Sequence, residues 1–324
     1  MNPQARKIVS VVFKIAIISL AFLFIYDKLN NNQNLSNFNA LTRSLSKTHV
    51  YVVLAMVFAL MLLNWFIESL KWKYLVQRIE RVTVWQAIES VFCGLTWAIF
   101  TPNRIGEYGG RMFFLSPRKR VFGAIGMLVG AFGQMVVTNI AGTMAVLWFT
   151  WRFIYPGLWL YLLLVFLGAI FCGFLILIYF NISWLNSLLN RFKVLKPLRR
   201  FFFILTRYRF KQLWKVLLFS VSRFVVFTTQ YYLIIHLLVP ELLFFEICMM
   251  VFLLFFVQSA LPSLDLLDVG VRSFVATYFF GFITTHDIAI MAATACVWFI
   301  NLIIPAILGS GFVLKINFFG NRTR

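Results

Sequence analysis

The sequence contains few charged residues. Asp, Glu, Lys and Arg make up 12% of its 324 residues and hydrophobic residues make up 62%, whereas a soluble domain is about a quarter charged and just under half apolar. This composition excludes a soluble globular enzyme, a disordered tail and a disulfide-stapled secreted module. Cysteine and histidine are also scarce, at 4 and 3 residues, and they form no CxxC, HExxH or paired-histidine spacing. We therefore expect no metal site and no cofactor, and we expect the cysteines to be small buried hydrophobic residues.

Acidic residues are the scarcest charged group, with 10 Asp and Glu against 30 Lys and Arg and a net charge of +20. In a soluble protein this excess would indicate nucleic-acid binding. Cytoplasmic loops of membrane proteins carry the same excess, so we expect no nucleic-acid partner. The chain also lacks GxSxG, P-loop and GxGxxG motifs, and we can name no catalytic residue. We expect that it is not an enzyme.

Apolar runs long enough to cross the roughly 30 Å hydrocarbon core recur along the chain. They predict an all-α polytopic membrane protein with one integral membrane domain over residues 1–324. Two apolar stretches, 83–115 and 241–282, are interrupted near the middle by proline, glycine and charged residues. We expect re-entrant broken-helix hairpins there, and two complete crossings in each stretch are the alternative. The runs typical of full transmembrane helices are 8–26, 50–70, 121–149, 157–180, 212–238 and 288–314.

Basic residues predict which loops are cytoplasmic. The loop 182–211 has the largest cluster of Lys and Arg and no acid, and the segments 71–81 and 118–120 are also basic. The stretch 83–115 should therefore leave the cytoplasmic face and return to it. By the same count the stretch 241–282 should leave the outer face and return to it. Both chain termini are then cytoplasmic.

The two interrupted stretches resemble each other. TPNRIGEYGGR at 101–111 and LPSLDLLDVGVR at 261–272 each place an acid four residues before an arginine. Together with their flanking helices they predict an inverted repeat, with repeat one at about 50–149 and repeat two at about 212–314. In transporters that are built from inverted repeats, the substrate site lies near the membrane midplane, between broken helices. The residues expected to break the helices are Pro102, Gly106, Pro262 and Gly270.

The two acid–arginine pairs are the main candidates for a binding site. Glu107/Arg111 and Asp268/Arg272 each share one helix face at i, i+4 spacing, and charges at this depth are costly unless paired or hydrated. Guanidinium groups near helix N-termini suit a phosphate. The alternative for each pair is a buried ion pair that only locks its hairpin.

Other charged residues in or beside the apolar runs are further candidates. Arg104 and Asp265 lie on the breaks, where either could line a cavity or balance a neighbour. Arg223 lies in the middle of the fifth predicted helix, and we expect it to pair with Glu107 or Asp268 or to contact a lipid phosphate. Glu68 lies at the end of the second predicted helix, where we expect it to form an interfacial salt bridge with Lys71 and Lys73.

Small and polar residues inside the helices predict helix packing. Gln134, Asn139 and Asn301 should form hydrogen bonds between helices. One face of the third predicted helix should allow close approach of its neighbours. The glycines on that face are Gly123, Gly126, Gly130 and Gly133.

The block from Phe92 to Leu115 and the block from Leu261 to Gly281 resemble the two signature regions of the lysylphosphatidylglycerol synthase transmembrane-region (flippase-like) family. ESLKWKYL at 68–75 and WFINLIIPAILGS at 298–310 also fit it. The resemblance implies a bacterial inner-membrane protein that moves a lipid between leaflets. Full-length synthases add a soluble aminoacyl-transfer domain, and we expect no aminoacyl transfer because this chain stops about ten residues after its last predicted helix.

Members of the family often carry an arginine in the helix after each hairpin. This chain has Gln134 and Trp298 in those neighbourhoods, which leaves the identity of the lipid open. The main hypothesis is a flippase for an anionic phospholipid or a polyprenyl-phosphate-linked lipid, acting by alternating access. One alternative is an intramembrane enzyme acting on a lipid phosphate. Another is a non-catalytic membrane partner of a separately encoded synthase or glycosyltransferase.

Overall fold

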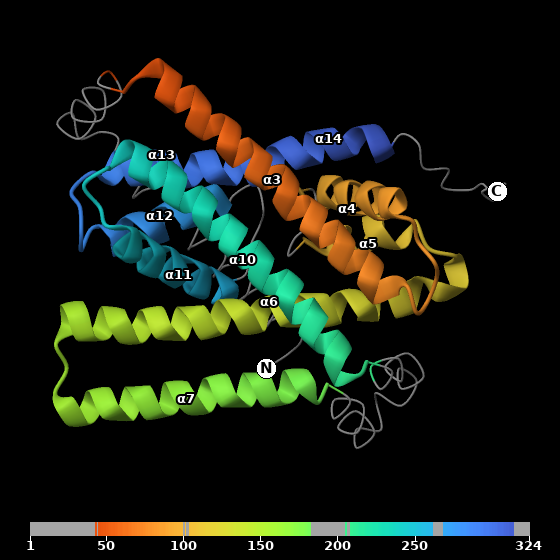
Figure 1. Ribbon diagram of the computed structural model, residues 1–324, viewed down its shortest axis with the longest axis horizontal. Coiled ribbons are helices and arrows are strands. Elements are labelled where there is room, and N and C mark those ends of the chain that lie inside the picture. The colour runs from red at the N-terminus through yellow and green to blue at the C-terminus, as the bar shows by residue number, and fades with distance from the viewer. Residues whose placement is uncertain are drawn as a thin grey trace, which may run out of the picture.

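The structure is a computed structural model that describes residues 43, 45–99, 101, 104–182, 205, 208–261 and 268–313. All the regular structure in these ranges is helical (Figure 1). The predicted all-α class is therefore confirmed. Four sequence candidates, Pro102, Pro262, Asp265 and the side chain of Asp268, lie outside the described residues.

Within the described ranges, five helical segments are long and apolar enough to cross a bilayer, at 23 to 38 residues each. They coincide with five of the six predicted spans, and the sixth, 8–26, lies outside the described residues. The chain is thus a multi-pass membrane protein. The segments are α3 (Lys47–Val76), Pro117–Ile154 with α6 (Arg120–Phe149), α7 (Leu158–Phe180), α10 (Phe210–Leu238), and Asp287–Phe312 with α13 (Asp287–Trp298) and α14 (Ile304–Val313).

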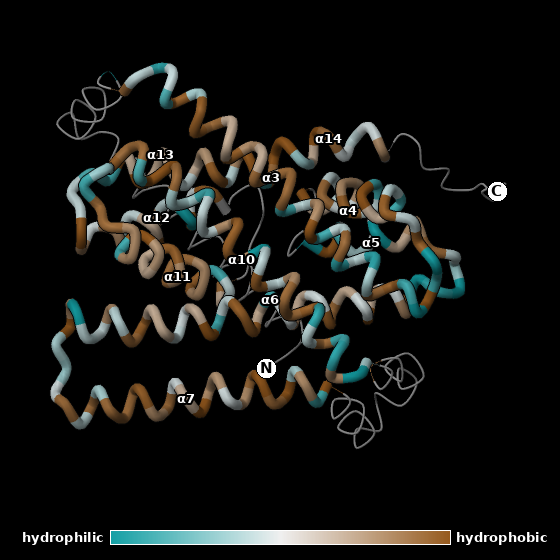
Figure 2. Tube along the Cα trace, viewed as in Figure 1, coloured by the Kyte–Doolittle hydropathy of each residue, from teal (hydrophilic) through white to brown (hydrophobic). Residues whose placement is uncertain are grey.

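Helix α7 lies at the edge of the bundle, below α6 in Figure 1. Only 6% of its most apolar window is buried inside the protein, and Figure 2 shows it mostly in the hydrophobic colour. An exposed helix of this composition is stable when lipid covers it. The Tyr179 hydroxyl anchors its end by donating to the carbonyl oxygen of Leu213 at 2.9 Å.

The two interrupted stretches form pairs of short helices. The first pair is α4 (Val84–Ile99) and α5 (Ile105–Met112), with 16 and 8 residues. The second pair is α11 (Phe244–Ala260) and α12 (Asp268–Phe280), with 17 and 13 residues. At 1.5 Å per residue these helices are about 12 to 26 Å long, short of the roughly 30 Å hydrocarbon core. The alternative of two complete crossings in each stretch does not fit these lengths.

Each hairpin begins and ends at one end of the bundle. At the first hairpin, the Ser116 amide and hydroxyl both donate to the Glu80 carboxylate, at 3.1 and 2.9 Å. At the second, His286 Nε2 lies 3.3 Å from Glu241 Oε1. These contacts join the segment that precedes each hairpin to the segment that follows it.

The hairpins enter the bundle from opposite ends, as an inverted arrangement requires. Leu115, which follows α5, packs on Gly123 in the first turns of α6. Phe149, at the far end of α6, contacts the rings of Phe279 and Phe282 with centroid separations of 5.5 and 4.9 Å. In Figure 1 the α4–α5 pair accordingly lies at one end of α6 and the α11–α12 pair at the other.

Glycine allows α4 and α5 to pack backbone to backbone. A Cβ on Gly110 would lie 2.5 Å from the Cα of Gly94, and a Cβ on Gly106 would lie 2.2 Å from the Trp97 carbonyl oxygen. Gly106 therefore lies just after the break, in the first turn of α5, where its role is close approach. The break itself includes Arg104, whose φ of 57° is in the left-handed region that non-glycine residues rarely adopt.

Candidate functional site

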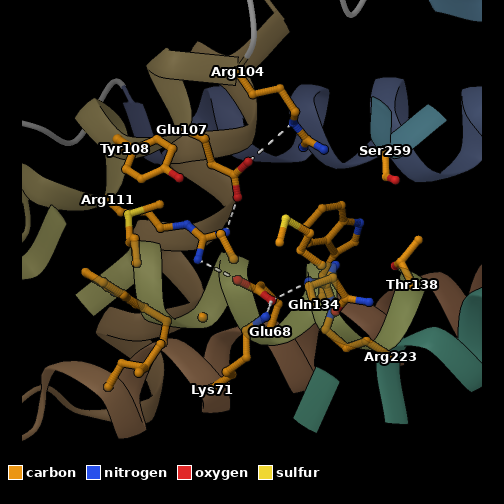
Figure 3. Close-up of a pocket in the computed structure, with 17 residues that line it drawn as sticks. Glu68, Lys71, Arg104, Glu107, Tyr108, Arg111, Gln134, Thr138, Arg223 and Ser259 are labelled. Atoms are coloured by element: carbon orange, nitrogen blue, oxygen red, sulfur yellow. Dashed lines mark hydrogen bonds and ion pairs between the residues drawn. The ribbon is translucent and has the colours of Figure 1, made fainter. Parts of the chain in front are cut away.

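The carboxylate of Glu68 on α3 lies at the centre of a buried charge cluster (Figure 3). Its Oε1 accepts a hydrogen bond from Arg111 Nη1 at 2.7 Å, and its Oε2 lies 2.7 Å from Lys71 Nζ. Arg223 on α10 also donates to Oε2. We expected an interfacial salt bridge with Lys71 and Lys73. The Lys71 contact is confirmed, but the interfacial position is wrong, because Glu68 is 6% exposed and also bonds two arginines.

The second carboxylate, Glu107, comes from α5. It accepts a hydrogen bond from Arg111 Nη2, and its Oε2 lies 3.3 Å from Arg104 Nε. Arg111 is 2% exposed and uses both ends of its guanidinium fork, one on each acid. The predicted i, i+4 pair of Glu107 and Arg111 is therefore confirmed, and it belongs to a larger network.

Arg223 is held on three sides. Its Nε donates to Asn64 Oδ1 at 2.9 Å, its Nη1 donates to Glu68, and its guanidinium carbon lies 5.2 Å from the Trp65 ring centroid. Of the expected acid partners, Glu107 is wrong, because α10 packs along α3 and Arg223 bonds Glu68 instead. The side chain of Asp268 lies outside the described residues, and contact of Arg223 with a lipid phosphate stays a prediction.

The groups alternate in charge, running Arg104, Glu107, Arg111, Glu68 and Arg223 (Figure 3). Lys71 joins this series at Glu68. Among the described residues, four cationic groups thus face two carboxylates around a cavity of about 370 Å³. Guanidinium and ammonium groups that line a cavity at this depth can be stabilised by a bound anion. The predominance of cations among the described lining residues therefore suits the cavity to an anion.

The cavity lies near half depth in the bundle. Gln134 and Met135, which line it, are the two central residues of α6, and Arg223 is next to the centre of α10. At 1.5 Å per residue the centre of α6 is about 20 Å from either end of the helix. This is the depth at which broken-helix transporters bind their substrates.

A second cavity of about 400 Å³ adjoins the first. Its lining includes Arg272 from α12, while Arg104 and Arg223 line both cavities. Arg111 and Arg272, the arginines of the two matched motifs, therefore line neighbouring cavities rather than one, and Arg104 and Arg223 are common to both.

The polar residues inside the helices do not form the predicted helix-to-helix bonds. Asn139 Nδ2 donates to the Met135 carbonyl oxygen at 2.8 Å, and Asn301 Nδ2 donates to the Val297 carbonyl oxygen at 3.0 Å. Both bonds are within one helix. Gln134 and Asn301 line the second cavity, and Asn139 lines neither cavity.

Close helix approach at the four glycines of α6 is confirmed. A Cβ at Gly123 would meet Leu115, one at Gly130 would meet Leu75, and one at Gly133 would meet the Tyr179 hydroxyl. Gly130 also lines the first cavity. The small-residue face therefore brings α6 close enough to α3 for Lys71 to lie beside it.

Sequence reasoning missed Asn64 and Trp65 and gave Glu68 and Lys71 an interfacial role. The sequence does contain a signal for this buried face, because residues 64, 68, 71 and 72 follow the i, i+4, i+7, i+8 spacing of one helix face. Polar residues on one face of an apolar helix indicate a buried polar surface. The guanidinium of Arg111, 6.0 Å from the Trp72 ring centroid, packs on that face.

Comparison with curated proteins and with solved structures gives no match. The family described as lysylphosphatidylglycerol synthase TM region matches residues 11–310. That region includes four of the six predicted spans in full, most of the spans 8–26 and 288–314, both hairpins and every residue of the charge cluster. The chain therefore belongs to the lysylphosphatidylglycerol synthase transmembrane-region family, which relates its function to membrane lipids.

Proposed function

We propose that the chain transports a lipid between the leaflets of the bacterial inner membrane by alternating access, with both termini cytoplasmic. The substrate is an anionic phospholipid or a lipid carried on a polyprenyl phosphate. The observation that carries this proposal is the cluster of four cations and two carboxylates around a cavity at half depth. A phosphate ester would bring negative charge to a site whose described charged residues are mostly cationic.

Arg111 and Arg223 are the groups that would bind the phosphate. Both donate to Glu68 in this structure, and a planar guanidinium fork can exchange a carboxylate for a phosphate because both present paired oxygens. Lys71 Nζ lies 2.7 Å from Glu68 and can stay there. The carboxylate would then keep a cation when the arginines turn to the lipid.

The two hairpins are placed to close the cavity alternately, one from each side of the membrane. The α4–α5 pair enters from the end where Glu80 and Ser116 meet, and the α11–α12 pair enters from the end where Glu241 and His286 meet. In our proposal, displacement of one pair opens the site to one leaflet while the other pair stays closed. The basic segment 182–211 would collect anionic headgroups at the cytoplasmic face.

The test is lipid translocation in proteoliposomes that contain the full chain. A fluorescent anionic phospholipid in the inner leaflet is protected from a membrane-impermeant quencher until it is moved to the outer leaflet. We expect Arg111→Gln, Arg223→Gln and Arg272→Gln each to slow translocation at least about tenfold, the effect of 1.4 kcal/mol. Arg152→Gln is the matched control, because Arg152 is exposed and lines neither cavity.

Unchanged transport in both Arg111→Gln and Arg223→Gln, with normal expression and melting temperature, would contradict the proposed site. The same liposomes distinguish a transporter from the two alternatives, an intramembrane enzyme and a non-catalytic partner of a synthase or glycosyltransferase. We expect the lipid to be recovered with unchanged mass, whereas an enzyme acting on the phosphate would alter it. A chain that only positions a synthase or glycosyltransferase would move no lipid when purified alone.

A further inference from the structure

The second cavity has a different wall from the first. Several of its lining residues carry a buried polar side-chain atom that has no hydrogen-bond partner among the described residues, and they come from helices far apart in the chain. Native interiors leave few such atoms without a partner. Several of them around one cavity indicate that a bound molecule supplies the missing hydrogen-bond partners. The atoms are Trp65 Nε1, Gln134 Oε1, Gln258 Nε2, Trp298 Nε1 and Asn301 Oδ1.

These atoms include both donors and acceptors. The indole nitrogens of Trp65 and Trp298 can only donate, while the amides of Gln134, Gln258 and Asn301 can do both. Rotation of such an amide or indole side chain would bring its polar atom to a group inside the cavity. The chemical group that serves donors and acceptors equally well is a hydroxyl.

The backbone beside this cavity is also irregular. Residues Phe299–Ile303 form a π-helical turn between α13 and α14, and Asn301 and Leu302 on this turn line the cavity. Pro305 explains the turn, because its ring has no N–H and would clash with the carbonyl of Asn301 four residues earlier. Such π-helical turns occur frequently at functional sites.

Aromatic rings form another part of the wall. Phe227 stacks on Phe255 with ring centroids 5.2 Å apart and an 18° interplanar angle, and Phe224 meets Phe255 edge-on at 5.6 Å. All three line the cavity. Flat aromatic faces beside amides suit a ring that carries hydroxyl groups at its edge and C–H groups on its face.

The charge of the wall selects against an amine. Arg104, Arg223 and Arg272 line the second cavity, and none of its described lining residues is acidic. Arg104 and Arg223 are paired with Glu107 and Glu68, which are not among the residues that line this cavity. The described wall thus offers an ammonium group cationic neighbours and no carboxylate to bind, whereas a neutral headgroup needs no counter-charge.

We propose that the second cavity binds a neutral, hydroxyl-rich headgroup, a ring polyol or sugar, joined to the phosphate that the arginines of the first cavity hold. This inference rests on the proposed function and narrows its substrate to phosphodiester lipids whose headgroup carries hydroxyls and no amine. The cavity of about 400 Å³ is within the range of about 300–1,000 Å³ of pockets that bind small organic molecules.

The experiment measures binding of four defined phospholipids to the full chain in detergent by native mass spectrometry. The probes are phosphatidylinositol, phosphatidylglycerol, phosphatidic acid and phosphatidylethanolamine, with matched acyl chains. We expect phosphatidylinositol to bind tightest and phosphatidylethanolamine at least about tenfold weaker. Gln258→Leu and Asn301→Leu should each weaken phosphatidylinositol about three- to tenfold, the effect of one lost hydrogen bond, and leave phosphatidic acid within about twofold.

Asn139→Leu is the matched control for Asn301→Leu. Both side chains donate to the carbonyl four residues earlier, at 2.8 and 3.0 Å, but Asn139 lines neither cavity. Asn139→Leu should therefore change no affinity. If Asn301→Leu fails to fold, Gln258→Leu decides, because Gln258 is only half-buried.

Two results would overturn the inference and leave the proposed transport intact. One is equal binding of phosphatidylinositol and phosphatidic acid with no effect of Gln258→Leu. The other is binding of phosphatidylethanolamine as tight as that of phosphatidylinositol. Failure to bind any of the anionic lipids would instead contradict the proposed function itself. A synthetic polyprenyl phosphate with and without an attached sugar distinguishes a sugar carrier from an inositol phospholipid.

Discussion

Arg223 on α10 and Glu68 on α3 form an ion pair across the bundle, although 155 residues separate them in the sequence. The contact joins one helix from each half of the predicted repeat. Because Glu68 also bonds Arg111 of the first hairpin, one carboxylate couples α3, α5 and α10. Any movement of α10 relative to the first hairpin must change the hydrogen bonds of Glu68.

Replacing Glu68 by Gln should destabilise the protein strongly. The substitution leaves Lys71, Arg111 and Arg223 without their shared counter-charge, and removal of one partner from a buried ion pair costs about 3–5 kcal/mol. Reversible unfolding in detergent measures the loss. Glu80→Gln is the control, because the amide oxygen can still accept a hydrogen bond from Ser116. The lost pair with Lys119, which is 45% exposed, contributes at most about 1 kcal/mol. Equal stability of the two variants would contradict the buried cluster.

A positive charge at position 223 should not be sufficient for transport without the planar guanidinium group of arginine. Lys has the same charge but no planar fork, so Arg223→Lys cannot bond Glu68 and Asn64 together as the arginine does. We expect translocation of an anionic lipid to fall at least about tenfold, equal to 1.4 kcal/mol, with unchanged expression. The conservative control is Arg152→Lys at an exposed site. Full activity of Arg223→Lys would show that only positive charge is needed.

Two neighbouring glycines in α5 should respond in opposite ways to a methyl group. In Gly110→Ala the new Cβ would lie 2.5 Å from the Gly94 backbone, whereas at Gly109 nothing lies within 4 Å. Overpacking against a backbone that cannot move aside should cost about 1–3 kcal/mol. Gly109→Ala should be neutral or stabilise by about 0.5–1 kcal/mol, because alanine favours the helix. Thermal unfolding of the two purified variants compares them directly.

The opposite insertion of the hairpins can be tested by thiol labelling. Ser116 follows the first hairpin and Thr285 follows the second, and both are exposed. In a chain whose 4 native cysteines are replaced, Ser116→Cys should react with a membrane-impermeant reagent only from the cytoplasmic side. Thr285→Cys should react only from the outer side. Labelling of both from one side would exclude the inverted arrangement.

Hydropathy and local spacing predicted the spans, the two interrupted stretches and the Glu107–Arg111 pair. These features depend on residues near each other in the chain, such as an acid four positions before an arginine. The partners of Arg223 could not be predicted in this way, because they depend on which face of α10 packs on α3. The position of Glu68 shows the same limit. Lys71 is local to it, whereas Arg111 is 43 residues away.

The separation of Arg111 from Arg272 has the same origin. Their matched motifs indicate equivalent roles, but the depth and rotation of each hairpin are set by contacts with other helices. Thr96 donates to the Ala306 carbonyl oxygen at 2.8 Å and fixes the first hairpin on α14. Gly142 lies against Phe256 and fixes the second on α6. The shared space therefore contains Arg104 and Arg223 between the two arginines.

The outermost and innermost of the five long helical segments should differ in how many amino-acid substitutions they tolerate. In α7 6% of the most apolar window is buried, whereas in Asp287–Phe312 the share is 61%. Lipid accepts any apolar side chain, but a neighbouring helix accepts only a matching shape. A library of single substitutions should accordingly show wide tolerance of apolar exchanges along α7 and a narrow repertoire along Asp287–Phe312.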